Sequence, residues 1–176
     1  MTRDPVADYI AAATTFVGLV ERIETADRDR VLGDLAIALA DLYSAAGRLP
    51  AGDASGEGLL SAGKVTGHLH ALLRVLEADD FLWDTVDWEF YGPWLDEPYE
   101  RWKLVTDLAN DLDEACGDLQ SAVAVLRKHG TRDDALWQVR MEFWSHTSDH
   151  VVSALRLLHP YLSSQLGGPA APPDPQ

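Results

Sequence analysis

The sequence predicts an all-α protein, a single-domain antiparallel bundle of about five helices. Apolar residues recur every three or four positions in five segments, as they do in amphipathic helices, and almost no segment alternates as a strand does. The chain has 176 residues, and a domain of this size buries roughly two thirds of its unfolded surface without help from a metal or a disulfide. We assign residues 1–166 to the helical domain and residues 167–176 to a proline-rich, disordered tail.

The first two helices are expected from their start signals and apolar stripes. Asp4-Pro5 opens the first helix, because proline is favoured in a first helical turn. Thr25 is the expected cap of the second helix, which ends before Gly47. The two stripes consist of Val6, Ile10, Ala13, Val17 and Val20, and of Val31, Leu35, Leu39 and Leu42.

A third helix is expected after a loop. Residues 48–58 are rich in glycine, proline, serine and aspartate, which is typical of a loop. Helical spacing returns from Leu59 to Glu77, and this helix carries His68 and His70.

Residues 79–102 break the helical period and are rich in aromatic side chains. Four of the six tryptophans lie here, together with Gly92-Pro93 and Pro98. Disordered segments are poor in aromatic residues, so we expect an ordered connection that packs across the bundle as a cap. The alternative is a lid or a binding loop.

The fourth helix, about Leu104 to Lys128, has an acidic stripe beside its apolar one. Asp107, Asp111, Glu114 and Asp118 follow one another at helical spacing. Like charges at this spacing repel, so the stripe needs cations, an arginine partner or water.

The fifth helix combines two histidines with a carboxylate on one face. Thr131 and Asp134 resemble a capping box at its start, and it runs to about His159 before Pro160 breaks or bends it. Glu142, His146 and His150 are spaced four residues apart and therefore stack on successive turns. The same face carries Val139, Phe143, Ala154 and Leu158, so the histidines are expected to face the core.

Charge narrows the function classes. The net charge is −15, so nucleic acid and anionic lipid would repel the protein. No apolar run reaches the roughly 20 residues that span a bilayer. The acidity serves solubility or attracts a basic protein partner.

The N-terminus and the cysteine content predict a cytoplasmic location. Arg3 and the nearby Asp4 and Asp8 do not form a signal peptide, and the single Cys116 fits a reducing compartment.

Three groups of residues carry a family resemblance. They are Trp83-Asp84-x-Val86-Asp87-x-Glu89-Phe90-Tyr91; Leu108-Ala-x-Asp111-Leu112 with Asp118-Leu119; and Trp137-x-x-Arg140-x-x-Phe143-x-Ser-His146-x-x-x-His150 with Ala154-Leu155-Arg156-x-Leu158-His159. This pattern resembles the bacterial domain of unknown function family 5063 from about Thr15 to His159. Thr147 and Ser148 stand where the family usually shows tryptophan and glycine. The resemblance implies an all-helical bundle and brings no established activity.

Three interpretations of the polar residues remain open. In the first they form a structural network that docks the aromatic segment, with Arg140 and Arg156 paired to the acidic stripe. Its members are Trp83, Asp84, Asp87, Trp88, Asp111, Asp118, Arg140 and Arg156, around His146 and His150.

The second interpretation is a site for zinc or another divalent metal. His146 and His150 would be ligands, with Glu142 and His68 as further candidates. The metal-binding DinB/YfiT-like bundles similarly combine an early histidine with a late H-x-x-x-H pair, although Val151 follows His150 where they usually have another histidine. The protein would then be a metal-dependent hydrolase or transferase.

The third interpretation, an acidic and non-catalytic accessory or protein-binding module without a cofactor, asks least of the residues and is the leading one. Its partner would be a basic protein or a second copy of the chain, bound through exposed tryptophans and an acidic face.

Overall fold

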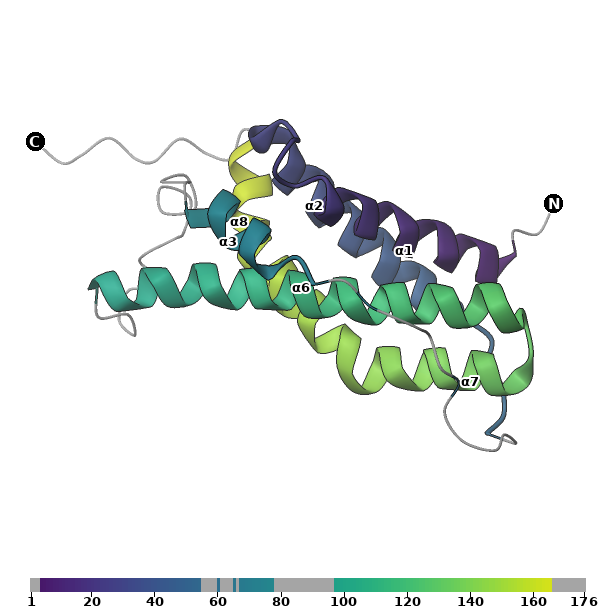
Figure 1. Cartoon of the computed structure of the whole chain (residues 1–176). Coiled ribbons are helices and arrows are strands. Elements are labelled where there is room, and N and C mark those ends of the chain that lie inside the picture. The colour runs from purple at the N-terminus through teal and green to yellow at the C-terminus, as the bar shows by residue number, and fades with distance from the viewer. Residues whose placement is uncertain (1–3, 55–59, 61–64, 66, 78–96, 166–176) are drawn as a thin grey trace, which may run out of the picture.

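The computed structural model describes residues 4–54, 60, 65, 67–77 and 97–165, and every regular element in these ranges is a helix (Figure 1). The all-α prediction is therefore confirmed. The elements are α1 (Pro5–Glu21), α2 (Arg28–Ala46), α3 (Leu69–Glu77), α6 (Glu97–His129), α7 (Asp133–Glu142), the π-helix η2 (Phe143–Thr147) and α8 (Ser148–Gln165).

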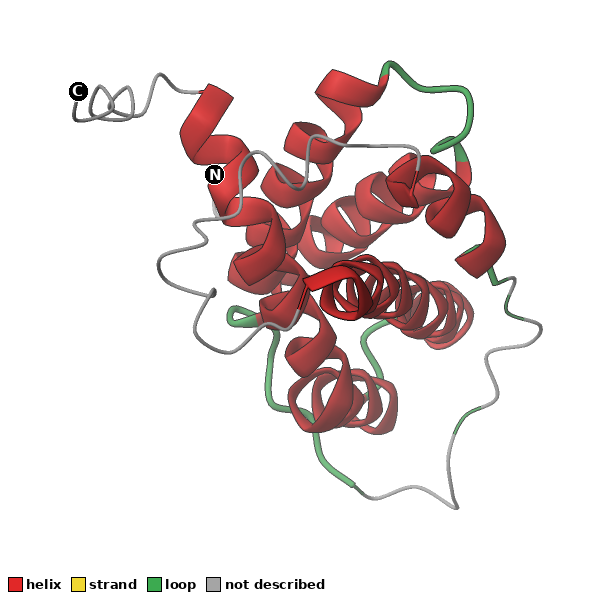
Figure 2. Ribbon diagram, turned by 90° about the vertical axis from the view of Figure 1, so that its left-hand side faces the viewer, coloured by secondary structure: helices red, strands yellow, loops and turns green. Residues whose placement is uncertain are grey.

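The long helix α6 is the centre of the fold. It packs against α1, α3, α7 and α8, while α2 packs against α1 and α8. Figure 2 looks nearly along α6 and shows the other helices arranged around it. The apolar stripe predicted for this helix is its core face, since Leu108, Leu112 and Leu119 are each at most 1% exposed.

The first two helices follow the sequence signals closely. Asp4 caps α1 by accepting a hydrogen bond from the Val6 N–H at 3.0 Å, and Pro5 occupies the first turn. The predicted α2 stripe is buried throughout. The cap of α2 is Asp27 and not Thr25, which bonds back to the Arg22 carbonyl.

Two helix boundaries differ from the prediction. The third helix begins at Leu69, ten residues later than Leu59, and the described residues 60, 65, 67 and 68 before it are not helical. The fourth helix begins at Glu97 and not near Leu104, because Pro98 falls in its first turn, where proline is tolerated. The last six residues of the predicted aromatic connection are therefore helical.

The predicted fifth helix consists of α7, η2 and α8. Figure 1 shows α7 running beside α6 and the chain turning away from that direction through η2, as helices do at π-turns. Arg132 is the cap residue of α7 and makes no side-chain cap bond, so the predicted capping box is wrong. Pro160 does not end α8, which continues to Gln165.

The segment after α2 lies across α7. Leu49 is buried, and the Asp53 N–H donates to the Asp133 carbonyl at 3.2 Å. Between them Gly52 adopts a φ of +61°, a left-handed conformation that glycine reaches without strain.

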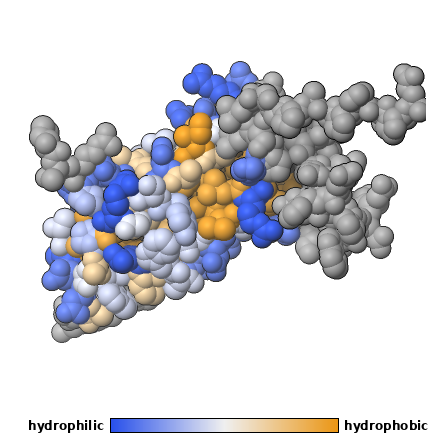
Figure 3. All heavy atoms as spheres, turned by 180° about the vertical axis from the view of Figure 1, so that it is seen from behind, coloured by the Kyte–Doolittle hydropathy of each residue, from blue (hydrophilic) through white to orange (hydrophobic). Residues whose placement is uncertain are grey.

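The surface is mostly hydrophilic. Figure 3 shows apolar residues gathered near the middle of the face opposite to that of Figure 1. Ile37, at 56% exposure, is the most exposed large apolar side chain in the described ranges. Within those ranges no helix combines the length and the apolar character that crossing a membrane requires.

Candidate functional site

The π-helix η2 is the centre of the candidate site, and buried side chains fix both of its ends. Phe143 is 1% exposed, and its ring contacts that of Tyr9 in α1 at a centroid distance of 6.2 Å. Thr147 is 3% exposed and donates its hydroxyl to Asp118 Oδ2 of α6 at 2.8 Å. Single π-turns are rare and occur frequently at functional sites. The three residues between these anchors are exposed.

The two histidines lie beside carboxylates of α6. His150 Nδ1 is hydrogen-bonded to Asp111 Oδ1 at 2.9 Å, and His146 Nε2 lies 3.9 Å from Asp118 Oδ2. The imidazole rings meet edge to face, with centroids 4.7 Å apart. The structure thus brings together four residues that the sequence singled out. The exposed fraction is 22% for the His150 side chain and 59% for that of His146, which does not face the core as expected.

The acidic stripe of α6 has two kinds of carboxylate. Asp111 and Asp118 have the partners just described, whereas Asp107 and Glu114 are exposed to water. The second oxygen of Asp111 is buried without a hydrogen-bond partner in the described part of the chain. The stripe is therefore held by imidazole and hydroxyl groups as well as by water.

The arginines do not pair with the stripe as predicted. Arg140 donates to the carbonyl of Leu49. Leu49 lies past the end of α2, so its carbonyl accepts no backbone hydrogen bond within that helix. Arg156 is exposed on α8, with no carboxylate at ion-pair distance among the residues described. Trp83, Asp84, Asp87 and Trp88 lie outside the described residues.

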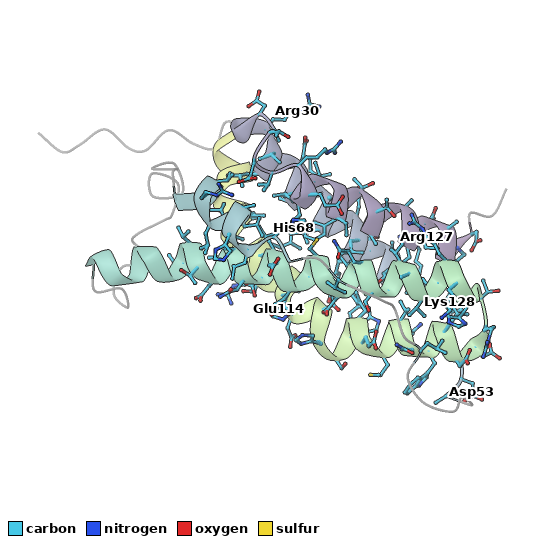
Figure 4. The ribbon with its side chains drawn as sticks, viewed as in Figure 1. Arg30, Asp53, His68, Glu114, Arg127 and Lys128 are labelled. Carbon is cyan, nitrogen blue, oxygen red and sulfur yellow. The ribbon has the colours of Figure 1, made fainter. Side chains whose placement is uncertain are left out.

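His68 lies apart from the histidine pair. Its backbone N–H donates to Asp113, two residues from Asp111 on α6 and thus about 200° around the helix. Figure 4 shows His68 at the start of α3. Within the described ranges, no three His, Cys, Asp or Glu side chains are grouped so that they could hold a metal ion.

His150 has one feature that suits a metal ligand, namely a carboxylate on one ring nitrogen that leaves the other free. A metal site remains a prediction that needs a third ligand.

Gln138 is a buried residue that the sequence reasoning missed. At 4% exposure, its side-chain amide accepts from the Leu60 N–H at 2.6 Å and donates to the Leu60 carbonyl at 3.1 Å. It also donates to Glu142 Oε1 at 3.0 Å. The amide therefore ties the connection before α3 to α7 and holds the Glu142 carboxylate in place.

The surroundings of Glu142 disfavour the charged form of its carboxyl group. Burial raises the pKa of Glu142 above its ordinary value, and the nearby Asp118 raises it further, against the opposing effect of the hydrogen bond from Gln138. Burial likewise raises the pKa of Tyr9, with additional contributions from Asp118 and Glu142. Two carboxylates and one phenol thus share a small region around Phe143.

Replacing Glu142 with glutamine should raise the melting temperature at pH 7, by up to about 3 °C for this half-exposed group. The folded state holds the Glu142 proton more tightly than the unfolded state, whose pKa is near 4.5. Stability is therefore lost as pH rises from about 4.5 through the folded pKa, and the two proteins should melt alike near pH 4. Circular dichroism melts test this, with exposed Glu114→Gln as the control. A lower melting temperature for Glu142→Gln at pH 7 would contradict it.

An exposed aromatic pair packs on the same Phe143. Trp144 of η2 and Tyr43 of α2 are 40% and 38% exposed, and their ring centroids are 5.4 Å apart. Both rings also contact the buried Phe143. No local sequence pattern points to this pair, because its members are 101 positions apart and a π-turn changes which side chains face outwards.

Comparison with known proteins identifies a family and a similar solved structure. The family model described as "Domain of unknown function (DUF5063)" matches residues 2–164. The crystal structure of protein BF1032 from Bacteroides fragilis, a Northeast Structural Genomics Consortium target, is similar with a TM-score of 0.64 at 18% identity. The match covers 98% of this chain and 97% of that one. No curated protein matches. At this identity the structural likeness shows a shared fold.

Proposed function

Because the chain belongs to the family described as Domain of unknown function (DUF5063), which assigns no activity, we propose from the site that it is a non-catalytic binding module for a basic protein segment. The observation that carries this proposal is the exposed pair of Trp144 and Tyr43. Two carboxylates belong to the same region of the chain: Glu142 precedes Trp144 by two residues, and Asp118 is hydrogen-bonded to Thr147 at the other end of η2. We call the aromatic pair and these two carboxylates the aromatic–acidic face.

The aromatic pair supplies an anchor for a cation. Arginine and lysine side chains bind over the faces of tryptophan and tyrosine rings, and tryptophan is the strongest of these partners. Trp144 rests on the buried Phe143, so its position is fixed before a partner arrives. A fixed aromatic anchor loses little conformational entropy on binding.

The carboxylates supply the matching charge. Burial is the main cause of the raised pKa of Glu142, and the nearby Asp118 raises it further because the two negative charges repel. A guanidinium or ammonium group bound near both carboxylates would relieve this repulsion. The net charge of −15 would also speed the approach of a basic partner. We place this function in the cytoplasm, in line with the single, buried thiol of Cys116.

Trp144→Ala is expected to weaken binding of a peptide that alternates arginine and alanine by about tenfold. Isothermal titration calorimetry at low and physiological salt measures this. The corresponding glutamate–alanine peptide should not bind. Asp118→Asn should also weaken binding, because the negative charge is lost. Asparagine can still accept the hydrogen bond from the Thr147 hydroxyl.

Two matched variants separate the site from general acidity. Asp107→Asn removes the same charge from an exposed position of α6, and Ile37→Ala removes an exposed apolar side chain elsewhere. Neither should change the affinity by more than about twofold. Equal weakening by Asp107→Asn and Asp118→Asn, or unchanged affinity in Trp144→Ala, would reject the aromatic–acidic face as the binding site.

A further inference from the structure

A groove between α1 and α6 lies away from the aromatic–acidic face. It encloses about 310 Å³, at the lower end of the range of roughly 300–1,000 Å³ for small-molecule sites. The buried side chains of Leu119 and Val123 and the half-buried Val17 supply apolar lining. The groove therefore combines an apolar surface with the polar side chains of Thr14, Glu21, Gln120 and Arg127.

Opposite charges stand at the two ends of this groove. Arg127 of α6 donates to the Thr14 hydroxyl of α1 at 3.3 Å, which fixes the guanidinium at one end (Figure 4). Glu21 lies two helical turns beyond Thr14 along α1, a rise of about 10 Å. Burial raises the pKa of Cys116 to about 12, and Glu21 is the acidic residue that adds most to this effect. Glu21 therefore lies beside the middle of α6.

Gly18 keeps the middle of the groove open. A side chain there would meet no atom within 4 Å, so packing does not require glycine at this position. Glycine in a helix interior costs about 1 kcal/mol relative to alanine. In the structure, glycine at position 18 leaves this wall of the groove open. The Gln120 amide also lines the groove and could bond a peptide group.

We propose that this groove binds a short apolar peptide of about three residues with free termini, whose extended length of roughly 10 Å matches the rise along α1 from Thr14, which bonds Arg127, to Glu21. The peptide carboxylate binds the Arg127 guanidinium, and the peptide ammonium binds the Glu21 carboxylate. Apolar side chains of the peptide pack on Leu119 and Val123. The site is independent of the proposed basic partner, because it shares no residue with the aromatic–acidic face.

Isothermal titration calorimetry with the tripeptide Ala-Leu-Ala tests the proposal on the full chain. We expect N-acetylation or C-amidation of the tripeptide to weaken binding about tenfold each, because each removes one charged contact. Arg127→Gln should abolish the effect of C-amidation, and Glu21→Gln that of N-acetylation. Gly18→Leu should fill the groove and abolish binding, while its helical circular dichroism stays at the wild-type level.

Arg48→Gln is the matched control, because Arg48 is an exposed arginine of the neighbouring α1–α2 groove and contacts Ser44. It should leave the affinity unchanged. No binding of the free tripeptide, or equal affinity for its capped forms, would overturn the proposal. Undiminished binding by Gly18→Leu would overturn it as well.

Discussion

Replacing Phe143 with alanine should lower the free energy of unfolding by about 3–5 kcal/mol, as other truncations of buried aromatic residues do. Phe143 is 1% exposed and contacts the rings of Tyr9, Tyr43 and Trp144. Its removal leaves a cavity under the first turn of η2 and takes away the support of the aromatic–acidic face. Equilibrium denaturation in urea measures the loss.

Two further variants give this experiment its controls. Phe143→Leu keeps most of the buried volume and should lose less than half as much stability. Trp144→Ala truncates the neighbouring but 40% exposed ring and should also lose clearly less than Phe143→Ala. A loss below about 1 kcal/mol for Phe143→Ala would mean that η2 does not depend on this anchor.

Gly52→Ala should be destabilised by about 2–4 kcal/mol, from the left-handed backbone and from a steric clash. A Cβ atom on Gly52 would lie 2.4 Å from the Trp137 backbone nitrogen and 2.5 Å from the Asp133 carbonyl oxygen. Both are main-chain atoms of α7, so no side-chain movement relieves the contact. The segment after α2 must then separate from α7, which should also appear as faster proteolysis there.

Gly130→Ala isolates the part of this effect that comes from the clash. Gly130 has a similar φ of +65°, but a Cβ there meets nothing within 4 Å. It should cost only the roughly 1 kcal/mol of the strained backbone. Equal losses in the two variants would show that the contact with α7 carries no energy.

The sequence could predict the helices whose signals are local. Asp4-Pro5 and the stripe of α2 depend on neighbouring residues alone, and both are found as predicted. The start of α6 was missed, because the aromatic composition of residues 79–102 outweighed the tolerance of a first turn for Pro98. The π-turn was missed for a different reason, since residues 145–150 are all polar and contain no apolar spacing that would show the change of helical period.

The candidate site could be predicted only in part. His150 stood out because ionisable groups on apolar faces are unusual, and Asp111 stood out as a member of the acidic stripe. The structure places the two side chains in contact. Tyr43 could not be matched with Trp144, nor Gln138 with Leu60, because each pair meets only after the bundle has assembled. Local patterns contain no information about which distant residues become neighbours.

The double hydrogen bond between Gln138 and Leu60 has a consequence for the order of folding. It joins positions 78 residues apart, so forming it early would close a long loop at a high entropic cost. The α1–α2 pair has a short connection and can form first, as contacts close in sequence usually do. The hydrogen bonds between Gln138 and Leu60 can form only after α7 has packed along α6. We therefore expect this pair of hydrogen bonds to form late in folding, attaching the connection before α3 once the bundle has assembled.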